Sequence, residues 1–200
     1  MKMNHLVFIE GVSGVGKTTT TPQVAEQLQR MGYKVRHYAE GANDNPLDPF
    51  GGVYPPDRLP ITAYCETYMQ CWQTFMKATL EHDMIIVDGT LLHHQINDLI
   101  RAYDAPNEVI ADYLADLLRI IQPLHPVIFY LSSHHVGQRL IQARKSRGQS
   151  VPTRERITFW EHRKSVDLFV LDRLPVESHR LEVDKGWDLI PGTIVQHIIK

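Results

Sequence analysis

Short runs of apolar residues alternate along this chain with longer segments in which apolar positions recur every three or four residues. The short runs are typical of buried β-strands, and the longer segments are typical of helices that bury one face. The runs predict five strands, at residues 5–9, 33–39, 84–88, 127–131 and 179–183. The periodic segments predict seven helices, at residues 18–31, 61–80, 91–103, 106–121, 133–146, 153–171 and 192–199. Strands that alternate with helices predict a doubly wound α/β fold with a parallel sheet.

The length and composition of the chain restrict its class. The 200 residues can bury one hydrophobic core but are too few for two ordinary domains, so residues 1–200 are expected to form a single domain. A net charge of −2 argues against bulk nucleic-acid binding, and no apolar run is long enough to span a membrane. Cys65 and Cys71 lie within the helical pattern at 61–80, which predicts core thiols in a reducing, cytoplasmic setting.

A glycine-rich segment joins the predicted strand at 5–9 to the predicted helix at 18–31. It reads Gly11-Val12-Ser13-Gly14-Val15-Gly16-Lys17-Thr18 and fits the pattern G-x-x-x-x-G-K-[ST]. Glycines let backbone N–H groups converge on phosphate oxygens, and the start of the helix adds its positive dipole end. A strand, a glycine loop and a helix in this order predict a phosphate-binding loop.

The residue types of this loop predict its ligands. Lys17 is expected to contact the β- and γ-phosphates, and the Thr18 hydroxyl is expected to ligate Mg²⁺. The sequence therefore predicts ATP and Mg²⁺ as cofactors. The residues expected to bind the nucleotide in this loop are Ser13, Gly14, Val15, Gly16, Lys17, Thr18 and Thr19.

The segment from Phe8-Ile9-Glu10 through the glycine loop to Thr19 resembles the opening of thymidylate kinases and their relatives. The order of the predicted elements also resembles the wider group of P-loop nucleoside and nucleotide kinases. This resemblance implies a five-stranded parallel sheet in the order 2-3-1-4-5, helices on both faces and a lid that carries arginines.

Other P-loop classes fit the sequence less well. A GTPase normally carries an N-K-x-D guanine motif, and the chain has no Asn-Lys pair. The D-T-x-R step of signal-recognition GTPases is replaced by Glu40-Gly41-Ala42-Asn43, and Val12 stands where partition ATPases have a lysine. A kinase remains the best match.

Three acids end the first three predicted strands, at the edge where open α/β sheets bind ligands: Glu10, Glu40 and Asp88. Asp88 follows four apolar residues, as a Walker B acid does, and is expected to organise Mg²⁺. Glu40 stands where deoxynucleoside kinases, which the chain resembles loosely, keep a carboxylate that takes the acceptor proton. Glu10 could equally be structural or functional, and Asp88 stays an alternative base.

The acceptor side is poor in positive charge. Thymidylate kinases follow the acid of strand three with an arginine, whereas here Gly89-Thr90 follows Asp88. Between Glu40 and Asp88 the only cations are Arg58 and Lys77, and a phosphate-bearing acceptor needs cations. We therefore expect a neutral or cationic small molecule with a hydroxyl, bound beside an acceptor-side loop at about 41–60.

Basic residues gather towards the C-terminal half of the chain. Residues 139–164 contain eight: Arg139, Arg144, Lys145, Arg147, Arg154, Arg156, Arg163 and Lys164. The stretch 144–153 lies between two predicted helices, where the kinases that the chain resembles have their lid. Arg147 and Arg144, and then Arg139, are expected to stabilise charge on the transferring phosphoryl group. A solvated basic helix face is the alternative.

Several weaker signals accompany these motifs. His93 and His94 could line the acceptor pocket, although surface positions are the commoner outcome for such residues. Trp187 borders the region that holds adenine in related kinases, but a packing role is the simpler interpretation. No Cys or His set has zinc-ligand spacing.

Taken together, these features predict a cytoplasmic small-molecule kinase that transfers phosphate to a hydroxyl. One alternative is a nucleoside monophosphate kinase of the thymidylate-kinase type, whose acceptor phosphate is held by Arg58 or Arg101. The other is a non-enzymatic, ATP-dependent regulatory switch. No nucleic-acid or membrane partner is expected. A homodimer through the helix at 61–80 is possible, because related kinases often pair through helices.

Overall fold

The computed structural model describes residues 6–40, 45–50, 59–78 and 84–200. Its five strands form one sheet in which all neighbouring strands are parallel. The strands are β1 (Leu6–Glu10), β2 (Val35–Tyr38), β3 (Met84–Asp88), β4 (Pro126–Ser132) and β5 (Glu177–Glu182). Their order in the sheet is β2-β3-β1-β4-β5, which confirms the predicted fold class and strand order.

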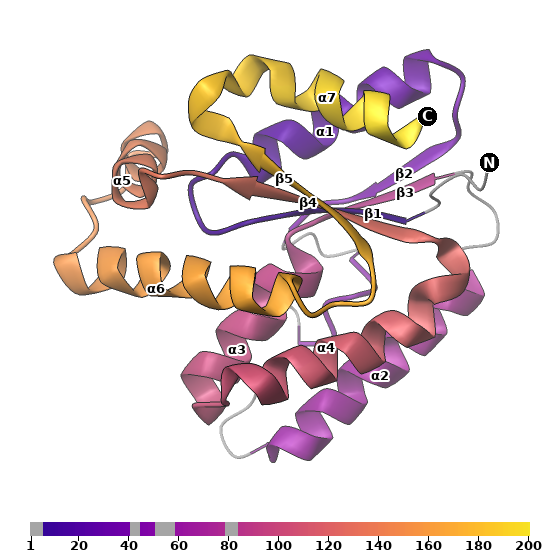
Figure 1. Cartoon of the computed structure of the whole chain (residues 1–200), viewed down its shortest axis with the longest axis horizontal. Coiled ribbons are helices and arrows are strands. Elements are labelled where there is room, and N and C mark those ends of the chain that lie inside the picture. Colours follow the sequence, from indigo (N-terminus) through magenta and orange to yellow (C-terminus); the bar gives the residue numbers. More distant parts are fainter. Residues whose placement is uncertain (1–5, 41–44, 51–58, 79–83) are drawn as a thin grey trace.

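Helices cover both faces of the sheet (Figure 1). The helices are α1 (Lys17–Arg30), α2 (Ile61–Ala78), α3 (Gln95–Tyr103), α4 (Asn107–Ile121), α5 (Val136–Ser146), α6 (Arg154–Leu171) and α7 (Ile190–Ile198). Helices α1 and α7 pack together on one face, whereas α2, α3, α4 and α6 lie on the other. Helix α5 packs against α6 at the end of the sheet where the glycine loop lies.

Each face of the sheet has its own apolar core. One core contains the alternate residues Leu6 and Phe8 of β1, and the other contains Val7 and Ile9. Successive side chains of a strand point to opposite faces, so a strand buried on both sides must be apolar throughout. The aromatic face of α2 belongs to the first core: Tyr64, Tyr68, Trp72 and Phe75 are buried there.

Several predicted boundaries were wrong, for local reasons. The helix expected from 133 begins at Val136, because Ser133 is used in a turn in which its Oγ accepts from the His135 N–H. The helix expected at 91–103 is α-helical from Gln95 onwards, and Thr90–His94 forms a π-helical turn. The strand expected from 179 begins at Glu177, and the helix expected from 192 begins at Ile190 with Pro191 in its first turn.

The two cysteines are half-buried free thiols rather than fully buried core residues. The Cys71 thiol donates to the carbonyl oxygen of Pro46 at 2.7 Å. Burial raises the pKa of each thiol to about 11, so both stay protonated at neutral pH. In the part of the chain that the structure describes, no helix is both long and apolar enough to cross a membrane.

Candidate functional site

The glycine loop turns tightly around the start of α1, which begins at Lys17. Gly14 and Gly16 have φ of 89° and 97°, in the left-handed region that favours glycine. A Cβ on Gly16 would lie 2.5 Å from Nε1 of Trp187, and one on Gly14 would lie 3.0 Å from the carbonyl oxygen of Arg139. Both backbone conformation and packing therefore require glycine at these two positions.

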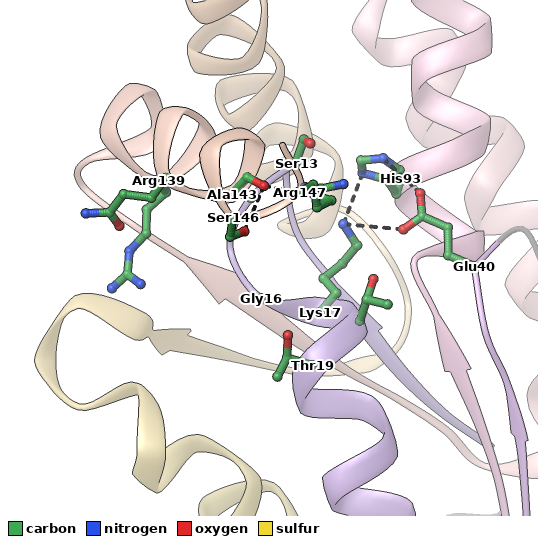
Figure 2. Close-up of a pocket in the computed structure, with 13 residues that line it drawn as sticks. Ser13, Gly16, Lys17, Thr19, Glu40, His93, Arg139, Ala143, Ser146 and Arg147 are labelled. Carbon is green, nitrogen blue, oxygen red and sulfur yellow. Dashed lines mark hydrogen bonds and ion pairs between the residues drawn. The ribbon is translucent and has the colours of Figure 1, made fainter. Parts of the chain in front are cut away.

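A cavity of about 530 Å³ opens above this loop. It is lined by Ser13, Gly14, Gly16, Lys17, Thr18, Thr19, Glu40, His93, Arg139, Gln142, Ala143, Ser146 and Arg147, and Figure 2 shows how the labelled residues surround it. Most of the predicted site residues thus meet around one space. Three do not line it, because Val15 and Asp88 are buried and Arg144 lies outside the lining.

The Lys17 ammonium group lies at the centre of a polar cluster. Its Nζ donates to the carbonyl oxygen of Gly11 at 3.0 Å and lies 3.4 Å from Nδ1 of His93. It also lies 3.9 Å from Oε2 of Glu40. The side chain is 5% exposed, so these groups take the place of solvent around a buried charge.

Glu40 binds both neighbouring histidines. Its Oε1 lies 3.5 Å from Nε2 of His93 and 3.4 Å from Nε2 of His94. The expectation that these histidines are on the surface was therefore wrong: His93 is buried and His94 is half-buried. The π-helical turn brings both rings to the same carboxylate, with their centroids 5.9 Å apart.

These contacts shift the pKa values of Glu40, His93 and His94 away from their ordinary values. Burial raises the pKa of Glu40, but the hydrogen bond from His94 and the charges of Lys17 and the histidines outweigh it and hold that pKa well below its usual value. Burial and the Lys17 charge hold the pKa of His93 well below its ordinary value. The pKa of His94 is raised, because the bond to Glu40 and nearby carboxylates outweigh its burial.

Asp88 ends β3 beneath the cavity, fully buried. Neither of its carboxylate oxygens makes a hydrogen bond of normal geometry within the described residues. Burial raises its pKa to about 6, while Lys17 and the Thr18 hydroxyl act in the opposite direction. Buried oxygens without partners and an exposed threonine hydroxyl next to the phosphate loop are a donor set that suits Mg²⁺.

Glu10 ends β1 and supports the π-helical turn from below. It is fully buried, and its two carboxylate oxygens accept from the N–H groups of Leu91 at 2.8 Å and His93 at 3.1 Å. Burial raises its pKa to about 7, against the opposing effect of Lys17. Of the two roles that the sequence left open, the geometry favours the structural one.

Arg163 of α6 supports the same turn from its other side. It was expected on a lid or a solvated face, yet it is fully buried. Its Nη2 donates to the carbonyl oxygen of Leu92 at 2.7 Å and lies 2.8 Å from Oδ1 of Asp167. The Tyr130 hydroxyl donates to the other oxygen of Asp167 at 2.9 Å. This arginine is therefore bound within the protein.

The three arginines predicted for the lid have different positions. Arg147 lines the cavity, and its Nε donates to the carbonyl oxygen of Ala143 at 2.9 Å. Arg144 donates from Nε to the carbonyl oxygen of Ser150 at 2.6 Å, within the stretch predicted as the lid. The Arg139 side chain extends away from Lys17 (Figure 2), and its guanidinium pairs with Asp184 at 3.0 Å.

Among the acceptor-side cations, Arg58 lies outside the described residues. Lys77 is exposed near the end of α2, and the Arg101 guanidinium lies 4.4 Å from the ring centroid of Phe159. Among the described residues, the arginines and lysines that line the cavity are Lys17, Arg139 and Arg147. Lys17 begins α1, Arg139 lies in α5 and Arg147 directly follows α5.

Sequence reasoning left the roles of two groups open and missed the role of a third. For the His93–His94 pair, the one signal was that it follows Asp88 in the sequence. A helix was expected there, and adjacent residues of a helix point in different directions, so a shared partner was not expected. Glu10 directly follows four apolar residues, which was the one sign that it would be buried. Asp184, which accepts from Ser133, the His134 N–H and Arg139, carried no motif.

The comparisons with known proteins give the fold. No family model and no curated protein sequence match the chain. Among the solved structures, the YorR protein from Bacillus subtilis, in complex with phosphorylated GDP, matches with a TM-score of 0.58 and 13% identity. The match covers 96% of this chain and 95% of YorR. At 13% identity, the match shows that the chain shares the α/β architecture of YorR. Because one fold can carry many activities, the function of this chain must be argued from the site.

Proposed function

We propose that the protein is an ATP- and Mg²⁺-dependent phosphotransferase that moves the γ-phosphate to a hydroxyl of a small molecule. The observation that carries this proposal is one cavity of about 530 Å³ that is lined by the glycine loop, Lys17 and Glu40. A donor site and a carboxylate that face one space fit the direct transfer of a phosphoryl group. That YorR was solved with a phosphorylated nucleotide agrees with a nucleotide in this cavity.

The glycine loop forms the donor half of the proposed site, where the phosphates of ATP would bind. The backbone N–H groups and the helix start of α1 would bind the phosphates, and the Lys17 ammonium would turn from its carbonyl partners to the β- and γ-phosphates. Thr18 and Asp88 would hold Mg²⁺, which would neutralise part of the charge on the phosphates. Arg147 would stabilise the charge of the transferring group from the lid side of the cavity.

Glu40 marks the acceptor half of the proposed site, where the hydroxyl that receives the phosphate would bind. Its depressed pKa keeps the carboxylate ionised, and an ionised carboxylate can accept the hydrogen bond of an acceptor hydroxyl. Positioning the hydroxyl in line with the phosphate supplies most of the catalysis in such a transfer. As the hydroxyl oxygen bonds to the γ-phosphorus, the bond from that phosphorus to the bridging oxygen would break, ADP would leave, and Glu40 would take the hydroxyl proton. Among the described residues, the lining cations are Lys17, Arg139 and Arg147, all of which the donor half and the lid would use, and this favours a neutral or cationic acceptor over a phosphate.

The test is ATP consumption by the purified chain against nucleosides, nucleoside monophosphates, amino sugars and hydroxyl-bearing antibiotics. A hit on a hydroxyl compound supports the proposal. A hit on a monophosphate would identify a nucleotide kinase instead, and Arg58→Ala would then impair turnover. Tight ATP binding without transfer to any acceptor would favour a regulatory switch.

Two substitutions connect the activity to the residues. Lys17→Ala should abolish turnover in a folded protein, whereas Arg30→Ala should not, because Arg30 lies at the exposed far end of the same helix. Glu40→Gln should lower kcat at least about a hundredfold, the lower range for general acid–base catalysis. Full activity of Lys17→Ala would contradict the assignment, and a normal rate of Glu40→Gln would move the base to Asp88.

A further inference from the structure

His93 lies between the two halves of the proposed site. On one side its Nδ1 is 3.4 Å from the Lys17 ammonium, and on the other its Nε2 is 3.5 Å from Oε1 of Glu40. The residue lines the cavity, and Figure 2 shows its ring beside both partners. His94 meets the same carboxylate oxygen, but it does not line the cavity.

The partners of His93 assign its proton. Two groups of opposite kind approach Nδ1: the Lys17 ammonium at 3.4 Å, which can only donate, and the Gly11 carbonyl oxygen at 3.2 Å, which can only accept. The ionised Glu40 carboxylate is a stronger acceptor than the Gly11 carbonyl, so the one proton of a neutral ring is on Nε2, which leaves Nδ1 to accept from Lys17. One neutral imidazole therefore satisfies both Lys17 and Glu40, and the burial that lowers the pKa of His93 keeps it neutral.

The protein holds this ring from three directions. The His93 ring stacks on Trp160 of α6, with centroids 5.2 Å apart and planes 8° apart. The backbone of the turn is bound by Glu10 through the His93 N–H and by Arg163 through the Leu92 carbonyl. A ring fixed in this way stays in place when one of its hydrogen-bond partners leaves.

We propose that His93 is a positioning residue that links Lys17 to Glu40 and keeps Glu40 aimed at the cavity when Lys17 turns to a phosphate. This inference rests on the proposed function. An incoming phosphate competes for the Lys17 ammonium and removes it from Nδ1 of His93 and from Glu40. The Nε2–H of His93 then remains as a donor to the carboxylate on the cavity side.

The first test observes the link in the protein without ligand. In the full chain with ¹⁵N-labelled histidine, NMR should show His93 as the neutral Nε2–H tautomer. Lys17→Met, which cannot donate, should shift the Nδ1 resonance of His93 and leave His94 nearly unchanged. Lys17→Gln is a second variant in case the Met variant does not fold, and Arg30→Met is the matched control on the same helix. Unchanged His93 nitrogens in a folded Lys17 variant would overturn the proposal.

The second test adds Mg²⁺ and AMP-PNP, a non-hydrolysable ATP analogue, to the wild-type protein. The Nδ1 resonance of His93 should move in the same direction as in Lys17→Met. Binding of the analogue without a change at His93 would overturn the link. A protein that does not bind the analogue would contradict the proposed function, and the Lys17 variants would still decide whether the link exists.

The third test separates positioning from structural support. His93→Phe keeps an aromatic ring for Trp160 but loses both nitrogens, whereas the amide of His93→Gln can replace the Nε2–H donor. We expect His93→Phe to lower kcat for ATP turnover roughly a hundredfold, the effect of a misplaced reacting group, with little change in the KM for ATP. His93→Gln should recover much of that loss. Equal rates in His93→Phe and wild type, or equal losses in both variants, would contradict the proposal.

Discussion

Glu10 and Glu40 lie at the same edge of the sheet and have opposite electrostatic environments. Glu10 is fully buried, so desolvation dominates and raises its pKa to about 7. Glu40 is partly exposed beside Lys17 and two histidines, and these neighbours outweigh its desolvation and lower its pKa. The same residue type therefore serves as a backbone acceptor in one place and as an ionised group of the cavity in the other.

The Glu10 carboxyl should make stability depend on pH. Its pKa of about 7 in the folded chain exceeds the ordinary 4.5, so the folded state holds the proton more tightly. The stabilisation that the Glu10 carboxyl gives the folded state is therefore complete below pH 4.5 and is lost as the pH rises towards 7. The free energy of unfolding of the wild type, relative to that of the permanently neutral Glu10→Gln, should fall by roughly 3 kcal/mol between pH 4 and pH 8. Urea unfolding across this range measures the difference, and a constant difference would contradict the raised pKa.

Gly16 should not tolerate a side chain, for two separable reasons. Its φ of 97° strains any other residue, and an added Cβ would meet the Trp187 indole at 2.5 Å. Gly16→Ala should therefore lower stability by more than the roughly 1–2 kcal/mol of left-handed strain alone. Adding Trp187→Ala, compared with Trp187→Ala alone, should relieve the clash but retain the strain. A Gly16→Ala variant as stable as wild type would show that the loop relaxes freely.

At the scale of elements, the π-helical turn at Thr90–His94 depends on its neighbours. Glu10 of β1 accepts from its N–H groups, and Arg163 of α6 donates to its carbonyl oxygens. π-helical turns are rare and are frequently found at functional sites. Here the two adjacent histidines at the end of the turn both reach one carboxylate.

Arg163 should matter to stability because its partners are buried with it. Arg163→Met leaves Asp167 as an unpaired charge and should lower the free energy of unfolding by roughly 3–5 kcal/mol. Replacing Asp167 by Leu and Tyr130 by Phe in the same variant removes the stranded polar groups and should recover part of the loss. Chemical denaturation of the single and triple variants checks both results. A triple variant no more stable than the single one would locate the loss in the π-helical turn itself.

At the scale of the whole molecule, nucleotide binding should stabilise the folded chain, because the loop exists only in the native state. Mg²⁺-ATP at a hundredfold excess over its Kd adds about 2.7 kcal/mol, which raises Tm by roughly 5–10 °C in a chain of this size. Adenosine lacks the phosphates that the loop would bind, so it should give a much smaller shift. Lys17→Ala should reduce the effect of Mg²⁺-ATP. A wild-type Tm that does not respond to millimolar Mg²⁺-ATP would contradict nucleotide binding.

The sequence by itself determined the parallel sheet and the glycine loop. Apolar runs and helical periodicity are local patterns that can be read from the sequence. A chain in which strands alternate with helices can adopt only a few topologies. The loop motif favours its own shape, because a strongly positive φ favours glycine, as at Gly14 and Gly16. The resemblance to kinases, resting on the same residues, supplied the strand order that the structure confirms.

Only the tertiary structure decided which polar side chains meet. Glu40, His93 and Lys17 come from three segments that are distant in sequence, and nothing local in any of them signals the others. Arg163 was one of eight basic residues in its region, and its burial depends on Asp167 and on a carbonyl 71 residues away in sequence. Burial and pairing are properties of the packed chain, because a charge leaves water only where distant segments supply partners for it.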